Sequence, residues 1–502
     1  MFRKTTIKIA FTILVISSCI SCKKWLDLQP TDGITGAKYW KTKEQVQAAV
    51  TGCYASLLGS PNGSRSLVDL LFLWGELRAD MLATTTVTPT EQVDIMNVNI
   101  LPTNSITDWR SVYQTINYCN TVIDFAPQVL DKDATFTQAE LNRSIAEVKS
   151  LRALMYFYLV RSFGDVPLKL KSTASDQDIA QIPKDSKDSV LSQIVRDLSE
   201  AEPNAVYTFG DRASDKGRIT KYTINAIQAD VYLWMEKYAE CITACNKIIN
   251  SNQFGLIDGT VSSTWFNTLY VNGNSNESIF EFQFDNQRQN TFFTLLGSSN
   301  RQLSANPLVL TDYFAVDFVN PLNIDIRGDG ASARSTDNMI WKYSGLSNDN
   351  RTQRPSTQYS AHWFVYRFAD VLMMKAEATN QLGNGQDALN LVGRIRTRAA
   401  ALDITNTNPS PTDKDAVADF IMAERSREFA FEGKRWYDLL RNAKRNNYQR
   451  LDILLQMVAN TVPPDRQQSA IAKFMDKNSH YFPIYFYELQ TDDQLEQNPF
   501  YR

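Results

Sequence analysis

Three glutamates near the carboxyl end of the chain are spaced so that they could do chemistry together. Glu424, Glu428 and Glu432 follow one another at intervals of four residues, so a continuous helix would place the three carboxylates on one face. Like charges at this spacing destabilise an isolated helix by roughly a few tenths of a kcal/mol per pair. The spacing therefore predicts that cations meet these carboxylates in the folded protein.

Two kinds of site fit such a set of carboxylates. Two of them could be the acid and the base of a glycoside hydrolase. Alternatively, they could form ion pairs that hold helices together, and Arg425, Arg427, Lys434 and Arg435 lie close by in the sequence. We favour ion pairs, because charged side chains inside proteins are usually paired.

The elements that position these glutamates follow a helix, break, helix pattern. Phe429 and Ala430 can face a core, and Gly433 lies where a helix would end in a left-handed cap. An apolar stripe at helical spacing restarts at Trp436 and continues to Leu440. We predict two helices that are separated by a turn at Gly433.

Composition places the chain among globular proteins and excludes several functions. Hydrophobic residues make up 43% and charged residues 21% of the 502 residues, which is ordinary for a protein with a large core. The net charge of -3 gives no electrostatic basis for binding nucleic acid. The two histidines, His362 and His480, are far apart, which makes a His-based zinc site or a Ser-His-Asp triad hard to build.

Short catalytic motifs are absent from the sequence. We find no Gly-x-Ser-x-Gly elbow, no phosphate loop and no His-Glu-x-x-His. Glycosidases often lack short signatures, so this absence alone does not exclude an enzyme. We nevertheless expect a protein that is not an enzyme, with no catalytic residue, no metal and no cofactor.

The amino terminus has the three parts of a bacterial export signal. Arg3, Lys4 and Lys8 supply positive charge, and residues 9–16 form an apolar run that is too short for a membrane span of about 20 residues. Ser21 and Cys22 then resemble the end of a lipoprotein signal. We predict a signal peptide over residues 1–21 and lipidation of Cys22, since several acyl chains give stable membrane attachment. A plain secretory signal is the alternative.

The remaining cysteines do not form a metal or disulfide pattern. Cys241 and Cys245 lie four residues apart on a predicted helix with Ala and Ile neighbours, which indicates packing in a core. Cys53 and Cys119 complete the set that would remain after processing at Cys22.

Helical hairpins recur along the chain. Two segments match at four positions with one constant offset: Ala229, Cys241, Ile242 and Ile248 correspond to Ala376, Ala388, Leu389 and Ile395. Each segment combines an apolar helix, a short turn and a second helix, as tetratricopeptide units do, and such pairs must stack to bury their faces. We count about four pairs, near residues 41–125, 140–202, 219–251 and 363–400.

A stretch near residues 254–342 differs from these hairpins. It has little helical period and is rich in Asn, Ser, Gly and Asp. Within it, Phe280, Phe282 and Phe284 alternate as on one face of a short strand. We predict a loop-rich insertion on the helical scaffold, and binding residues concentrate in such loops.

Four motifs in the right order resemble the SusD/RagB family of outer-membrane lipoproteins. Residues 424–439 read Glu-Arg-Ser-Arg-Glu-Phe-Ala-Phe-Glu-Gly-Lys-Arg-Trp-Tyr-Asp-Leu, which is similar to the family's carboxyl-terminal signature. Residues 151–167 carry Leu-Arg-Ala, Tyr-Phe and Phe-Gly-Asp-Val-Pro, and residues 367–378 begin Arg-Phe-Ala-Asp-Val-Leu. The fourth match, within residues 480–499, contains Phe-Pro-Ile, Glu-Leu and Asn-Pro.

The resemblance implies both a fold and a function. The fold would be mainly α, a tetratricopeptide-like solenoid of helical hairpins with a loop-rich lobe that carries short strands. The protein would be anchored by lipid in the outer membrane and face the exterior. There it would capture an oligosaccharide and deliver it to a SusC-like TonB-dependent transporter. A peptide-binding RagB-like member of the same fold and an envelope glycoside hydrolase are the alternatives.

The candidate ligand-binding residues come from two regions. Trp265 and Tyr270 lie in the insertion, outside any helix that the pattern predicts, and Arg288 follows in a Gln- and Asn-rich stretch. Trp74 and Asp80 precede a Thr-rich loop. Exposed aromatic rings beside polar side chains suit a sugar, and packing in the core is the alternative for the two tryptophans.

The resemblance also implies a division of the chain. Residues 22–225 would form an amino-terminal helical region. Residues 226–502 would form a carboxyl-terminal region that includes the insertion at about 254–342.

Overall fold

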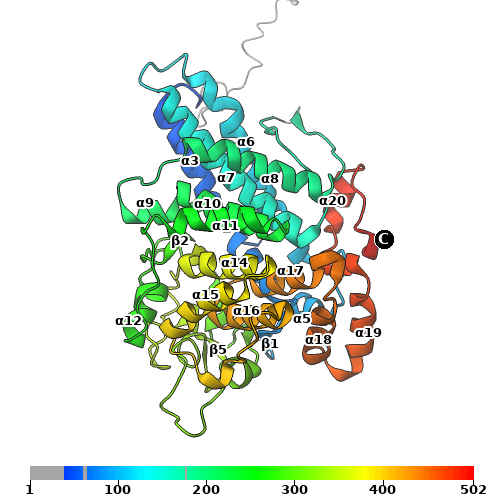
Figure 1. Cartoon of the computed structure of the whole chain (residues 1–502). Helices are drawn as coiled ribbons and strands as arrows, with labels where there is room; N and C mark the ends of the chain where they lie inside the picture. Colours follow the sequence, from blue (N-terminus) through cyan, green and yellow to red (C-terminus); the bar gives the residue numbers. More distant parts are fainter. Residues whose placement is uncertain (1–38, 60–64, 176–177) are drawn as a thin grey trace, which may run out of the picture.

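A computed structural model describes residues 39–59, 65–175 and 178–502 (Figure 1). The predicted signal peptide and Cys22 lie outside these residues. None of the helices described is both long and apolar enough to cross a membrane. The division into residues 22–225 and 226–502 stays a prediction.

The predicted hairpins form one stack of helices. In chain order they are α3 (Lys43–Leu57) with α6 (Arg110–Phe125), α7 (Gln138–Phe163) with α8 (Lys187–Ala201), α10 (Lys221–Trp234) with α11 (Tyr238–Ile249), and α14 (Phe368–Gln381) with α15 (Gly385–Arg398). α6 packs on α7, α10 on α8, and α11 on α14 (Figure 1). The prediction of a mainly helical, hairpin-based fold is confirmed.

The long helix α7 shows how the sequence sets an element. Thr137 and Glu140 form a capping box at its start, and Gly164 ends it with a φ of 77°. From Ser150 to Phe163 every residue is buried, because neighbouring helices cover this half of α7 on all sides. The Gly and Pro residues after Phe163 therefore end the helix where the sequence predicted.

The internal repeat is a real structural repeat. Ala229 lies in α10 and Ala376 in α14, while Cys241 and Ala388 lie near the starts of α11 and α15. All four side chains are buried. The cysteines Cys53, Cys119, Cys241 and Cys245 are free and buried, as core packing requires.

The carboxyl-terminal quarter adds further helices against this stack. They are α16 (Lys414–Glu428), α17 (Arg435–Tyr448), α18 (Asp452–Thr461), α19 (Pro464–Phe474) and α20 (Phe486–Thr491). α16 packs on α14 and α15, and α17 packs on α4 (Leu67–Glu76) near the other end of the sequence. The two ends of the chain thus share one core.

The insertion forms a lobe with short elements. It contains α12 (Ser262–Phe266), α13 (Trp341–Ser344) and three single π-helical turns, Asn267–Val271, Phe293–Gly297 and Val309–Tyr313. Its strands are β2 (Ser278–Phe282), β3 (Leu303–Ala305), β4 (Ala333–Arg334) and β5 (Met339–Ile340). The prediction of a loop-rich lobe with short strands is confirmed, but all five residues of β2 are buried, so both of its faces are covered.

Antiparallel pairing joins the lobe to the rest of the chain. β1 (Leu82–Thr84) pairs with β3, with Leu82 opposite Ala305 and Thr84 opposite Leu303. β2 pairs with β6 (Trp363–Arg367), and β4 pairs with β5. The segment after α4 and the insertion, far apart in sequence, therefore lie side by side.

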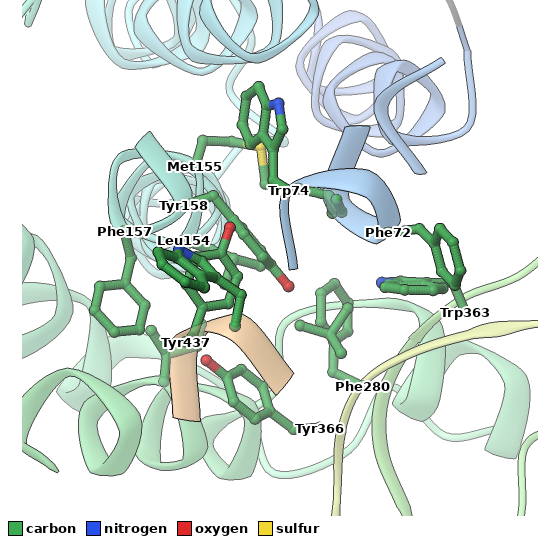
Figure 2. Close-up of a cluster of buried hydrophobic side chains, with 14 of the residues drawn as sticks. Phe72, Trp74, Leu154, Met155, Phe157, Tyr158, Phe280, Trp363, Tyr366 and Tyr437 are labelled. Carbon is green, nitrogen blue, oxygen red and sulfur yellow. The ribbon is translucent and has the colours of Figure 1, made fainter. Parts of the chain in front are cut away.

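The core contains a cluster of aromatic side chains from several elements (Figure 2). Trp74 of α4, Tyr158 of α7, Tyr437 of α17 and Trp363 of β6 are all buried. Gly75 makes this packing possible, because a Cβ on it would lie 1.9 Å from the carbonyl oxygen of Gly433. Gly433 has a φ of 68°, as the sequence predicted, so two glycines let α4 meet the turn before α17.

Candidate ligand-binding site

The three glutamates form the centre of a buried ion-pair cluster. Arg327 Nη1 lies 2.7 Å from Glu424 Oε1 and 2.9 Å from Glu428 Oε2. Arg367 Nη1 lies 2.5 Å from Glu428 Oε1, and Lys342 Nζ lies 2.9 Å from Glu432 Oε1. The interpretation of these carboxylates as ion pairs that hold elements together is confirmed.

The details of the pairing differ from the prediction. α16 ends at Glu428, so Glu432 lies in the following turn and not on the same helix face. Of the nearby cations, Arg427 does pair with Glu424, but Arg425 pairs with Asp438. The main partners come instead from the insertion, β6 and α15: Arg327, Lys342, Arg367, Arg396 and Arg398.

The electrostatics of the cluster do not suit acid catalysis. Burial alone would raise the pKa of Glu424 and Glu432, but the charges of Arg327 on the first and Arg367 on the second bring both pKa values to about 2. Both side chains are fully buried. Ionised, enclosed carboxylates of this kind have neither a proton to donate nor contact with a substrate.

Three of the predicted binding residues lie in the core. Trp265 is part of α12, so the prediction that it lies outside any helix is wrong, and its side chain is only 1% exposed. Tyr270 packs against it with ring centroids 5.5 Å apart. Trp74 is fully buried and donates its indole N–H to the carbonyl of Ile106 at 2.7 Å. None of these three rings offers a face to a ligand in the solvent.

The other two predicted residues reach the surface, Arg288 with an exposed side chain and Asp80 with a side chain that is 13% exposed. Arg288 is exposed on the surface of the insertion. Asp80 lines a cavity of about 330 Å³ at the edge of the β1–β3 pair, together with residues that the sequence did not single out. The lining residues are Asp80, Asn306, Leu308, Asp312, Tyr313, Ala423, Arg427, Met457, Asn460 and Thr461, and we call this the Asp80 cavity.

The β1–β3 pairing builds the cavity. The backbone N–H of Asn306 donates to the carbonyl of Met81 at 2.8 Å, and its side-chain amide donates to the carbonyl of Asp80 at 3.2 Å. The π-helical turn at Val309–Tyr313 follows directly and brings Tyr313 over Asp80. α18 closes the other side with Met457 and Asn460.

Asp80 is fixed by two partners. Arg435 donates from Nε to Oδ1 at 2.8 Å and from Nη2 to Oδ2 at 2.7 Å, and the Tyr313 hydroxyl donates to Oδ2 at 2.5 Å. Burial alone would raise the pKa of Asp80, but the positive charge of Arg435 lowers it below its usual value. Asp80 is therefore an ionised acceptor at neutral pH.

The Asp80 cavity is connected to the ion-pair cluster. Arg427 donates to the carbonyl of Tyr313 at 3.0 Å and to Glu424 at 2.9 Å. One row of contacts thus runs from the buried glutamates through Arg427 and Tyr313 to Asp80. The cluster holds one wall of the cavity in place.

A smaller cavity continues the Asp80 cavity along α18. It measures about 210 Å³ and shares Asp80, Met457 and Asn460 with its neighbour. Arg450 lines it and pairs with Asp419 and Asp452 at 3.2 Å and 3.3 Å. Together the two spaces form an open surface depression with acceptors, donors and apolar side chains.

Most residues of this site carry only weak signals in the sequence. Tyr313 and Asn306 lie in the predicted insertion, but nothing in their spacing separates them from its other polar residues. α18 lies at the cavity only because α17 folds back on α4. Within the described part of the chain, no group of His, Cys, Asp and Glu side chains could hold a metal ion.

Comparisons with known proteins agree with this architecture. The model of a family described as "SusD family" matches residues 234–501, and one described as "Starch-binding associating with outer membrane" matches residues 24–243. SusD-like protein P38 of Formosa agariphila is 27% identical over 483 residues, which covers 87% of this chain and 92% of that protein.

Solved structures share the fold. A SusD superfamily protein from Bacteroides vulgatus aligns with a TM-score of 0.74 at 20% identity, covering 92% of this chain and all of that one. A structure described as a laminarin-binding SusD-like protein aligns with a TM-score of 0.68 at 22% identity, again over 92% of this chain and all of that one. Since the first family model spans more than half of the sequence, the chain belongs to the SusD family.

Proposed function

We propose that this protein captures an oligosaccharide in the Asp80 cavity and delivers it to a SusC-like TonB-dependent transporter without breaking a bond. The description of the amino-terminal family match as starch-binding and the laminarin-binding relative support a glycan as the ligand. The size of the cavity supports it as the binding site, since its volume is within the range of roughly 300–1,000 Å³ that small-molecule sites have.

The observation that carries this proposal is the pairing of β1 with β3, which brings together two segments that are far apart in the sequence. It sets the carboxylate of Asp80 and the ring of Tyr313 beside Asn460 and Thr461 of α18. Carboxylate, amide and hydroxyl groups bond sugar hydroxyls, while Leu308 and Met457 can cover the apolar face of a sugar ring.

The charges around the cavity favour a neutral glycan. Arg427 is paired with Glu424, Arg435 with Asp80, and Arg450 with Asp419 and Asp452. Asp312 is exposed and has no cationic partner among the described residues. Every arginine that lines the cavity is therefore neutralised, and among the described residues the cavity offers no unpaired cation to a uronate or a sulfate.

Retention in a glycan affinity gel tests the site. The Asn460 side chain is exposed and makes no hydrogen bond within the described chain, so Asn460→Ala removes a proposed ligand contact without disturbing the fold. We expect Asp312→Ala combined with Asn460→Ala to weaken strongly the retention by a neutral glucan that retards the native protein. Asn390→Ala, on the exposed face of α15, is the matched control.

The same experiment separates the alternatives. Retention by a polyuronate in place of neutral glucans would contradict the neutral site, and binding to peptides alone would favour the RagB-like alternative. New reducing ends after incubation with a glycan, lost on mutation of one carboxylate, would show an envelope hydrolase.

We place the protein at the outer membrane through an acylated Cys22. The family description "associating with outer membrane" supports the location. Replacement of Cys22 by Ser should release the mature protein into the soluble fraction. Continued membrane attachment of that variant would contradict the anchor.

An exposed apolar loop supports a protein partner. Phe318, Val319 and Leu322 are 88%, 96% and 91% exposed, and they follow Tyr313 of the Asp80 cavity within nine residues. Large apolar side chains gathered in the solvent are typical of an interaction surface. We propose that this loop contacts the transporter beside the ligand.

Cross-linking in intact envelopes tests this contact. Phe318→Asp with Leu322→Asp should lower the yield of a cross-linked transporter while retention by glycan in the affinity gel stays unchanged. Val261→Asp, which changes an apolar side chain that is 55% exposed outside the loop, is the control. An undiminished yield in the double variant would remove the loop from the interface.

A further inference from the structure

A second cavity lies on a different part of the surface from the Asp80 cavity. It measures about 380 Å³ and is formed by the segment between α8 and α10, which contains the short helix α9 (Arg212–Gly217), and by the residues after α11. In Figure 1, α9 and α18 lie on opposite sides of the molecule. We call it the Tyr207 cavity.

Three aromatic rings line this cavity in a row. The ring of Tyr207 packs on Tyr222 with centroids 5.2 Å apart, and Tyr222 packs on Phe254 with centroids 5.1 Å apart. Tyr207 is 58% exposed, whereas Tyr222 and Phe254 are partly buried. The row therefore runs from the solvent into the cavity and presents ring faces that the core aromatics do not.

Two lysines contact rings of this row. Lys221 Nζ lies 4.8 Å from the ring centroid of Tyr207, and Lys216 Nζ lies 4.3 Å from that of Phe254. Lys216 also donates to the carbonyl of Ser278 at 2.6 Å, which ties α9 to β2. The rings are thus positioned before any ligand arrives, which lowers the entropy cost of binding.

Hydrogen bonds also fix the loop that carries Tyr207. Asp215 accepts from the Thr208 hydroxyl at 2.8 Å and from the backbone N–H of Phe209 at 2.5 Å. Asp211 caps α9 by accepting from the N–H of Ser214 at 2.9 Å. Both carboxylates are engaged in the fold.

Several polar groups at the cavity remain available. Within the described chain, the hydroxyls of Tyr207 and Tyr222 and the side chains of Arg212 and Asn276 have no hydrogen-bond partner. Arg212 and Asn276 are exposed. Flat rings flanked by unused donors and acceptors match the two kinds of surface that a sugar presents, its C–H face and its hydroxyl edge.

We infer that the Tyr207 cavity is a second saccharide-binding site, which stacks a sugar ring on Tyr207 and bonds its hydroxyls through Arg212 and Asn276. The site is separate from the Asp80 cavity, and only the choice of a saccharide as the ligand class rests on the proposed function. Two sites on one protein would hold a long glycan more tightly than either site alone, provided the chain spans both.

Affinity gels with soluble starch, laminarin and a set of other polysaccharides, both neutral and acidic, test the inference. For a polymer that retards the native protein, Tyr207→Ala should weaken binding by roughly three- to tenfold, the value of one aromatic contact. Tyr207→Phe should keep most of the binding. Tyr118→Ala, which removes an exposed tyrosine of α6, is the matched control and should change nothing.

A combination of variants separates the two sites. In the Asp312→Ala, Asn460→Ala background, residual retention that disappears on adding Tyr207→Ala would support the second site. Loss of binding from Tyr207→Ala alone, with no effect of the Asp80-cavity variants, would keep this inference and remove the proposed primary site. Unchanged retention in Tyr207→Ala, with native thermal unfolding, would overturn the inference, as would a native protein that no polysaccharide retards.

Discussion

The ion-pair cluster around Glu428 and the Asp80 cavity use the same chemistry to different ends. In both, arginines pair with carboxylates at hydrogen-bond distance. In the cluster each of the three glutamates has two or more cations and is buried. At the cavity, Asp80 is paired but lies at the edge of an open space. Access to the solvent, more than the pairing itself, separates a structural carboxylate from one that can meet a ligand.

A buried carboxylate without a contacting cation among the described residues, Glu76, shows how the cations affect the pKa of the others. Glu76, four residues before Asp80, accepts from the backbone N–H groups of Gly433 and Lys434 at 2.8 Å and 3.3 Å, and has no cation in hydrogen-bond contact within the described chain. Burial raises the pKa of Glu76 to about 8, whereas Arg435 lowers that of Asp80. Burial without a cation thus raises the pKa of one carboxylate, whereas pairing with a cation lowers the pKa of its neighbour.

The largest effect should come from breaking the cluster. Arg367→Met removes a cation that Glu277, Glu428 and Glu432 share inside the protein. We expect the free energy of unfolding to fall by about 3–5 kcal/mol in denaturant titrations, because three buried carboxylates each lose one of their cations. Arg450→Met, whose partners Asp419 and Asp452 are exposed, should cost less than about 1 kcal/mol. Equal losses for both variants would show that burial does not distinguish the pairs.

The next effect concerns Glu76 and depends on pH. Between the unfolded pKa near 4.5 and the folded pKa near 8, the folded state keeps a proton that the unfolded state has lost, so stability falls as pH rises through this window. Glu76→Gln removes the titrating group while it keeps the acceptor for Gly433. We expect the native protein to lose up to about 4 kcal/mol more than this variant between pH 5 and pH 9. Parallel stability curves for the two proteins would contradict the raised pKa.

A smaller change is expected at the Asp80 cavity. Tyr313→Phe keeps the ring and removes the hydroxyl that donates to Asp80. Loss of a hydrogen bond to a charged group should lower the free energy of unfolding by about 2 kcal/mol. Because Tyr313 lines the cavity, retention by a neutral glucan should fall as well. If the variant is less stable but the glucan gel retards it as much as the native protein, Tyr313 stabilises the fold and does not contact the ligand.

The smallest loss of stability is expected for Trp265→Phe, which tests whether an aromatic residue of the core takes part in binding. Trp265→Phe keeps an aromatic ring in the core beside Tyr270 and should cost about 1–2 kcal/mol of stability. Glycan retention at a temperature where the variant is folded should equal that of the native protein. Weakened retention would show that Trp265 does contribute to glycan binding.

Much of the fold could be predicted from the sequence. Apolar periodicity located the hairpins, and the offset between Ala229 and Ala376 identified two repeats that do stack, through α11 and α14. The Gly433 turn was also predicted, with its positive φ. These features are local, since they depend on spacing within about one or two helices.

The candidate site was predicted only in outline. The two regions that build it were identified, yet of the five residues named only Asp80 lines the cavity. Trp265 and Trp74 follow the alternative of packing in the core, because a sequence shows how large and apolar a side chain is but not what covers it. Tyr313 and Asn460 carry no local signal that marks them.

Spacing along the chain therefore predicts the helical hairpins, their repeat and the need for cations around three glutamates, and the motifs indicate the family. The packing of distant elements sets which cations these are, because Arg367 and Arg327 lie 61 and 101 residues from Glu428 along the chain. It also decided where the cavity lies, since Tyr313 meets Asp80 across 233 residues. Periodicity specifies which face of an element is apolar, whereas the partner of a charged side chain depends on how distant elements pack.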